Sequence, residues 1–128
     1  MNSLIVDAAR NKIFLTLIID KNIYTCSHEN SKINFEKLIL LISEFLKNNK
    51  CSLDDVSSIY VNRGPGSFAG IRNSLSVVKA FHVVNKIDYY CFSFKDFGDK
   101  SDVKYENIPE LCEKIKAKKN LINPIYLS

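Results

Sequence analysis

The chain has 128 residues, of which 46% are hydrophobic and 25% charged; this length and composition are typical of one folded domain and exclude a disordered chain. Eighteen Lys and Arg residues against 14 Asp and Glu give a net charge of +4, which allows an anionic partner but does not identify a dedicated nucleic-acid-binding protein. No apolar run approaches the roughly 18 residues of a membrane span, so we expect no membrane insertion.

The first residues of the chain and its cysteine and histidine content allow predictions about the compartment and about metal binding. The first seven residues lack a cationic segment and reach Asp7 before an apolar segment forms, so no signal peptide is expected. The four cysteines form no CxxC pair, and two histidines are present. We therefore expect reduced thiols in a cytoplasmic protein, with no metal and no cofactor.

Three strands are predicted at the start of the chain. Residues 4–7 and 13–19 are apolar runs, and residues 23–26 carry the β-branched and aromatic bias of a strand. The polar residues 20–22 have the composition of a hairpin turn. The opening segment is therefore predicted to form an antiparallel meander.

A helix is predicted over about residues 35–47. Asn34 is placed to cap its start, and Ile33 and Leu38 are placed to form a hydrophobic staple. Leu40 projects to nearly the opposite side from the main apolar stripe, so burial in the core does not explain why this residue is apolar. That stripe comprises Phe35, Leu38, Leu41, Ile42, Phe45 and Leu46.

A second helix follows a strand and a glycine-rich loop. Residues 52–55 indicate one helical turn, residues 58–62 a strand, and Ser67 is placed to cap a helix that reaches about Val84. This helix has two apolar stripes, which predicts that it packs on two sides. One stripe comprises Ile71, Leu75 and Val78, and the other Val77, Ala80, Phe81 and Val84.

The last predicted elements complete a recognisable order. Residues 89–94 indicate a strand, and Asn107 is placed to cap a final helix with Pro109 in its first turn. The resulting order, βββαβαβα, is that of a ribonuclease-H-like layer. The predicted fold class is therefore α/β, with helices packed on the faces of a mixed sheet.

The loop over residues 64–72 is the most informative segment, because three glycines and a proline lie between a strand and a helix. It is not a Walker A loop, since Gly70 is followed by Ile71 and Arg72 and not by Lys and Ser or Thr. Two interpretations stay open. The glycines permit a tight turn and close helix packing, or the helix N-terminus, flanked by Arg63 and Arg72, holds an anion or a partner.

Asp7 is the candidate for a phosphate-facing or metal-facing carboxylate. It ends the first strand, where ribonuclease-H-like and actin-like enzymes keep such a group. No second carboxylate is evident to complete a metal site, so a turn-stabilising role is favoured. The lysines at positions 114, 116, 118 and 119 are interpreted as a solvated helix face, with RNA contact as the alternative.

Residues 64–72 read GPGSFAGIR and closely resemble the GPGSFTGIR signature of the TsaB family, also called YeaZ, which supports synthesis of threonylcarbamoyladenosine on tRNA. Residues 4–7, 52–56 and 124–127 also resemble family segments. Together these matches cover about residues 1–98 and 105–127. The chain departs from the family at Asn34, where relatives often have His, and at Ala69 and Ser128, which replace Thr and Arg.

Family members usually have two actin-like lobes, so the resemblance implies a shortened form. Residues 1–95 would make the core of a single lobe, and residues 96–104 a short connection in place of most of the second lobe. Residues 105–128 would form a C-terminal helix and tail that return to the first lobe.

The resemblance implies a non-catalytic subunit that binds the transferase TsaD as a heterodimer, with TsaE in a larger complex and tRNA contacted indirectly. Its signature loop comprises Arg63, Gly64, Pro65, Gly66, Ser67, Phe68, Gly70 and Arg72. The first two helices would supply the partner interface, through Leu40, Val77, Ala80, Phe81 and Val84. Two alternatives remain: a small nucleotide-hydrolysing or nuclease-like domain that uses Asp7, or a homodimer formed by the same helices.

Overall fold

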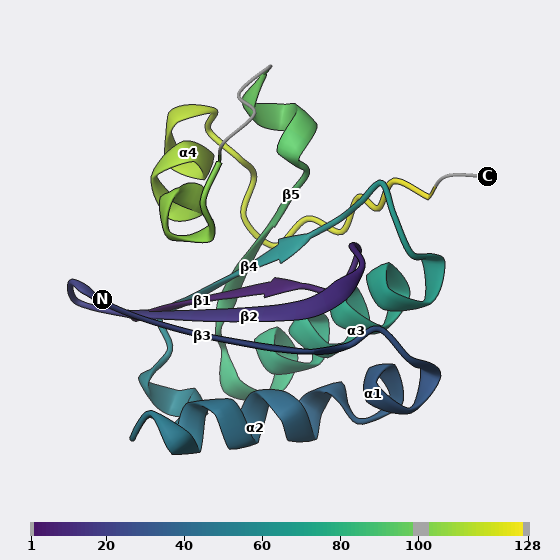
Figure 1. Cartoon of the computed structure of the whole chain (residues 1–128). Helices are drawn as coiled ribbons and strands as arrows, with labels where there is room; N and C mark the ends of the chain where they lie inside the picture. The colour runs from purple at the N-terminus through teal and green to yellow at the C-terminus, as the bar shows by residue number, and fades with distance from the viewer. Residues whose placement is uncertain (1, 99–102, 127–128) are drawn as a thin grey trace.

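A mixed β-sheet lies between two layers of helices (Figure 1). The computed structural model describes residues 2–98 and 103–126, and within them the sheet has five strands in the order β3-β2-β1-β4-β5. β1, β2 and β3 form an antiparallel meander, while β4 and β5 run parallel to β1. The strands are β1 (Asn2–Asp7), β2 (Lys12–Ile19), β3 (Asn22–Glu29), β4 (Ser58–Asn62) and β5 (Asp88–Phe92).

Helices cover both faces of this sheet (Figure 1). One face carries α1 (Lys32–Glu36), α2 (Leu38–Asn48) and α3 (Phe68–Asn85). The other carries α4 (Ile108–Lys114). Short 3-10 turns are η1 (Leu53–Asp55), η2 (Phe94–Phe97) and η3 (Tyr105–Asn107). No helix in the described part of the chain is long and apolar enough to cross a membrane.

The predicted α/β fold class and element order are confirmed, and three strand boundaries move by two or three residues. β1 begins at Asn2, two residues before its predicted start. β3 continues to Glu29, three residues beyond the predicted end, because it pairs with β2 over its full length. β5 ends at Phe92, two residues early. There the Ser93 hydroxyl accepts from the Lys95 N–H, which starts the turn η2.

The prediction for the first helix is wrong in its start. Ser31, not Asn34, is the N-cap, because its hydroxyl accepts from the Asn34 N–H. The helix is interrupted at Lys37, which separates α1 from α2. Ile33 is 69% exposed and forms no buried staple. All six residues of the predicted stripe are nevertheless buried against the sheet.

The larger apolar cluster of the described residues lies between the sheet and α1, α2 and α3. On α3 the stripe of Ile71, Leu75 and Val78 is buried, as predicted. Phe81 is also in this core, with 7% of its surface exposed. The expectation that Phe81 belongs to a second, uncovered stripe is therefore wrong, because its helical position turns it towards the sheet and not away from it.

A smaller cluster lies on the opposite face, beneath η2, η3 and α4. It is built on Ile5, Tyr60 and Phe92 of the sheet, which Phe97, Ile108 and Cys112 cover. α4 begins as predicted, but the Asn107 side chain makes no capping bond. Asn107 already has helical backbone angles, because η3 runs directly into α4. The parts of the predicted connection and tail at residues 99–102 and 127–128 lie outside the described residues.

Candidate functional site

The glycine-rich loop is packed against the turn between β1 and β2. The Ser67 N–H donates to the Ala9 carbonyl at 2.9 Å. A Cβ atom added to Gly66 would overlap that same carbonyl oxygen, and one added to Gly70 would overlap the Ala8 carbonyl oxygen. The Ser67 hydroxyl caps α3 by accepting from the Gly70 N–H at 3.2 Å. These contacts support the interpretation that the glycines serve close packing.

Asp7 joins three segments through one buried network. Its Oδ1 accepts from the Ala9 N–H at 3.1 Å and from Asn62 Nδ2 at 3.0 Å. Its Oδ2 accepts from the Tyr105 hydroxyl at 2.6 Å. Asn62 in turn accepts from the Gly64 N–H at 2.9 Å through its Oδ1. The network therefore ties the end of β1, the start of the glycine-rich loop and η3 to one another.

The buried network shifts the pKa values of both of its titratable groups, Asp7 and Tyr105. Burial raises the pKa of Asp7, and the hydrogen bonds from Tyr105, Ala9 and Asn62 oppose that shift. Burial and the neighbouring Asp7 carboxylate raise the pKa of Tyr105, so its hydroxyl stays protonated and donates. Within residues 2–98 and 103–126, no three His, Cys, Asp or Glu side chains group in a way that suits a metal ion.

Arg63, which precedes the glycine-rich loop, is held by two segments that follow it in the chain. Its guanidinium donates to both carboxylate oxygens of Asp96, at 2.8 and 3.4 Å, and to the Asn123 carbonyl at 3.1 Å. Its side chain is 16% exposed. Asp96 therefore neutralises Arg63, so the open interpretation that an anion binds at the start of α3 would have to rely on Arg72 and the backbone N–H groups.

The described end of the chain lies against the same loop. The Ile125 N–H donates to the Arg63 carbonyl at 2.7 Å. The Tyr126 ring lies 4.6 Å from the Phe68 ring, centroid to centroid. The Arg72 guanidinium lies over the same Phe68 ring, 5.6 Å from its centroid. The described end of the chain therefore packs beside Phe68, the first residue of α3, although Phe68 and Tyr126 remain 55% and 42% exposed.

The predicted partner face is only partly exposed. Leu40 on α2 is 52% exposed and Val84 on α3 is 75% exposed, and Ala80 is exposed as well. Val77 is half-buried against the core, beside the buried Phe81. Two further exposed apolar side chains lie outside the predicted stripes, Ile39 on α2 and Val83 on α3. We call Ile39, Leu40, Ala80, Val83 and Val84 the helical apolar face.

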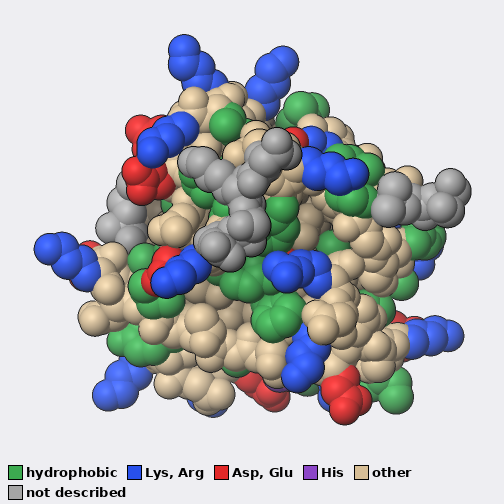
Figure 2. Space-filling model, turned by 45° about the horizontal axis from the view of Figure 1, so that its top comes forward, with side chains coloured by type: hydrophobic (Ala, Val, Ile, Leu, Met, Phe, Trp, Pro, Cys, Tyr) green, Lys and Arg blue, Asp and Glu red, His purple; other side chains and the backbone are tan. Residues whose placement is uncertain are grey.

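The lysines near the C-terminus do not form one basic site. Lys114 lies 3.4 Å from Glu110, and Lys119 lies 3.7 Å from Asp88. Figure 2 shows Lys and Arg side chains scattered over this side of the molecule, with Asp and Glu among them. The arrangement agrees with a solvated surface.

Sequence reasoning missed the residues that complete the buried network. Asn62 carried a usable signal, because it is a polar residue at the end of a predicted strand, directly before the glycine-rich loop. No local feature of the sequence indicated a role for Asp96 or Tyr105. Their partners, Arg63 and Asp7, are 33 and 98 positions away in the chain, so no local pattern links them.

The architecture defines a class: a ribonuclease-H-like α/β layer whose signature loop is held against the first hairpin. Two solved structures share this fold. YeaZ from Pseudomonas aeruginosa has a TM-score of 0.66 and 20% identity, over 72% of this chain and 43% of that one. Thermus thermophilus RuvC, solved in complex with a Holliday junction substrate, has a TM-score of 0.57 and 8% identity, over 93% and 99% of the two chains.

The sequence comparisons identify the family. The family model described as TsaD, tRNA N6-adenosine threonylcarbamoyltransferase, matches residues 29–93. Two curated relatives from Buchnera aphidicola are named tRNA threonylcarbamoyladenosine biosynthesis protein TsaB. The one from subspecies Baizongia pistaciae is 36% identical over 76 residues, which cover 49% of this chain and 34% of that protein. The one from subspecies Schizaphis graminum is 28% identical over 90 residues, which cover 70% and 43%.

The chain belongs to the TsaB/YeaZ family. It matches less than half the length of these curated relatives.

Proposed function

We propose that this protein is a non-catalytic subunit of the machinery that makes threonylcarbamoyladenosine on tRNA, and that it binds a TsaD-type transferase. The observation that carries the proposal is family membership, because the relatives are named for this biosynthesis. The match to a TsaD family model adds support for a related partner. In this proposal tRNA is contacted indirectly through the complex, and TsaE joins the larger assembly.

The helical apolar face is the proposed contact with the transferase. Leu40 and Val84 each leave more than half of their surface exposed, although α2 and α3 bury their opposite sides in the core. Burial of such side chains by a partner helix is stabilising. Val77 and Phe81, which belong to the monomer's packing, support this face from beneath and are not its main contacts.

We propose further that the chain acts as one lobe. β5 leads through η2 to residues 103–126, which return to the same sheet through the Tyr105–Asp7 bond and the Arg63–Asn123 bond. In this proposal residues 1–95 are the core, residues 96–104 the connection, and residues 105–128 the returning segment.

The test is co-purification of this protein with the TsaD of its own source, followed by a threonylcarbamoyladenosine assay with and without it. The proposal predicts a stable complex and modified tRNA when both proteins are present with TsaE and the threonylcarbamoyl donor. A matched reaction without this protein is the control. Equal modification in the control, together with no complex, would contradict the proposal.

The nuclease-like alternative rests on Asp7 and is less well supported. Both carboxylate oxygens of Asp7 already accept hydrogen bonds from the protein, one of them from Tyr105. A metal ion or phosphate would have to displace these donors. Turnover of ATP or RNA by the purified protein that disappears in Asp7→Ala would support the alternative.

A further inference from the structure

The two edges of the sheet differ in how their backbone groups are used. At the β5 edge, the Asn120 N–H donates to the Tyr89 carbonyl at 2.7 Å, and the Tyr89 N–H donates to Asn120 Oδ1 at 2.9 Å. Lys119 forms an antiparallel bridge with Tyr90. At the β3 edge, no strand of the described residues pairs with the outer side. The β5 edge is therefore covered by the chain itself, and the β3 edge is open except at Glu29, whose carbonyl accepts from Asn34 Nδ2 at 2.9 Å.

β3 lacks the features that usually keep an edge strand from pairing. It has eight residues, pairs with β2 without a bulge, and contains no proline and no lysine. Its only acidic residue, Glu29, is at its end. Two large apolar side chains beside the open edge, Ile23 and Tyr24, are 44% and 37% exposed.

The hairpin turn determines which backbone groups face outwards. β2 and β3 are joined by the two-residue turn Asp20–Lys21, and Ile19 is paired with Asn22 beside it. In a hairpin of this length the pair that flanks the turn exchanges both hydrogen bonds, and the pattern then alternates. The N–H and C=O groups of Ile23, Thr25 and Ser27 therefore point away from β2, towards the open edge.

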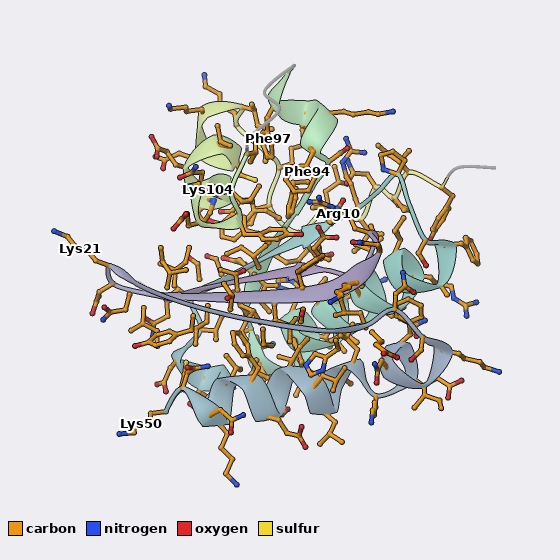
Figure 3. The ribbon with its side chains drawn as sticks, in the orientation of Figure 1. Arg10, Lys21, Lys50, Phe94, Phe97 and Lys104 are labelled. Atoms are coloured by element: carbon orange, nitrogen blue, oxygen red, sulfur yellow. The ribbon has the colours of Figure 1, made fainter. Side chains whose placement is uncertain are left out.

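We propose that β3 pairs with β3 of a second copy of this chain, antiparallel and centred on Thr25, to give one continuous sheet across a two-fold axis. This register pairs Thr25 with Thr25 and Ile23 with Ser27, so outward-facing groups meet outward-facing groups. It also places Lys21 of each copy opposite Glu29 of the other. Figure 3 shows Lys21 projecting from the tip of the hairpin, clear of the rest of the chain.

Charge complementarity identifies the occupant. Lys21, the turn residue just before β3, and Glu29, the last residue of β3, come opposite each other only when the two strands run in opposite directions, as a two-fold axis requires. A parallel pairing would bring like charges together. The interface uses the backbone of β3 and not the helical apolar face, so it goes beyond the proposed contact with the transferase.

The backbone test removes one outward-facing donor. We expect the wild-type protein to show a mass approaching twice 14.6 kDa in sedimentation as its concentration rises. Thr25→Pro deletes an N–H that makes no bond to β2, so it should leave the fold intact, by circular dichroism, and abolish the dimer. Thr25→Val keeps the N–H and is the matched control, which should still dimerise.

A cysteine test fixes the register. In a Cys26→Ser background, Thr25→Cys places two thiols opposite each other, with Cα atoms about 5.5 Å apart, and mild oxidation should give a covalent dimer. Ile23→Cys places its two thiols about 14 Å apart and should give little. A monomer at all concentrations, a dimer that persists in Thr25→Pro, or equal cross-linking of both cysteine variants would overturn the proposal. A dimer that Val84→Asp alone disrupts would overturn it too, in favour of helical self-association.

Discussion

The two faces of the sheet are held together by different means. On the α1–α3 face, long apolar stripes meet a continuous core of aliphatic and aromatic side chains. On the η2–α4 face, the apolar cluster is smaller, and polar bonds fix the segments: Tyr105 to Asp7, and Arg63 to Asp96. Figure 3 shows Arg10 close to Phe94 on this second face, where the guanidinium lies 5.2 Å from the ring centroid. Substitutions in the core of the first face should therefore lower stability through the loss of packing with many neighbours. On the second face they should lower it through the loss of single hydrogen bonds or ion pairs.

The largest effect is expected from Leu75→Asp, within the core of the first face. Leu75 is 4% exposed, and an unpaired carboxylate there costs several kcal/mol, out of a typical total stability of about 5–15 kcal/mol. We expect loss of the cooperative thermal transition in circular dichroism. Val84→Asp, on the same helix but 75% exposed, is the control and should melt within about 2 °C of the wild type. Similar melting of both variants would refute the assignment of the two sides of α3.

Gly70→Ala tests the junction between the signature loop and the first hairpin. The added Cβ would overlap the Ala8 carbonyl oxygen and approach the Phe35 ring at 3.1 Å, so backbone has to move. We expect a loss of about 2–4 kcal/mol in the free energy of unfolding, measured with urea. Ala69→Gly is a neighbouring helix substitution with no such overlap, and it should cost only about 1 kcal/mol. A Gly70→Ala variant as stable as the wild type would show that the close packing is unimportant.

On the second face, Tyr105→Phe removes one hydrogen bond and leaves the ring in place. The Asp7 carboxylate, fully buried, then loses the donor at 2.6 Å. We expect a loss of about 1–3 kcal/mol, since an unsatisfied buried charged group pays its desolvation cost. Tyr126→Phe, which removes the same hydroxyl from a ring that is 42% exposed, is the control. Equal stability of Tyr105→Phe and the wild type would mean that the bond does not hold η3 in place.

Asp7→Asn is expected to change the pH dependence more than the stability itself. Because burial raises the pKa of Asp7 above its ordinary value, the folded state binds more protons than the unfolded state just above that value. The contribution of Asp7 to stability is therefore greatest below its unfolded pKa of about 3.9 and declines as pH rises through the folded pKa. Asp7→Asn should flatten that decline in urea titrations between pH 4 and 7. An unchanged slope would contradict the assignment.

The sequence predicted the first face better than the second for a physical reason. A stripe such as Leu38, Leu41 and Phe45 is encoded locally, by helical spacing, so its burial can be inferred without knowing the partner. Helix starts are less secure, because Ser31 and Asn34 are both good caps and the side-chain geometry selects Ser31.

In the candidate site, too, only the features that are encoded locally in the sequence were predicted. The close packing of the glycine-rich loop was predicted as one of two interpretations, since glycine at a strand–helix junction has few other uses. The ion pair of Arg63 with Asp96 was not predicted, because it depends on how η2 folds back over the end of β4. Phe81 was assigned to the wrong side of α3, because the spacing of two apolar stripes does not show which of their residues are buried in the core.

The binding affinity of Val84→Asp for the transferase tests the central claim most directly. We predict that the variant stays folded and binds the TsaD of the same source at least about tenfold more weakly than the wild type in calorimetry, a loss of about 1.4 kcal/mol or more. Leu40→Asp, 52% exposed on α2, should weaken binding as well. Unchanged affinity in both folded variants would contradict the account, because the helical apolar face would then not be the surface that meets the transferase.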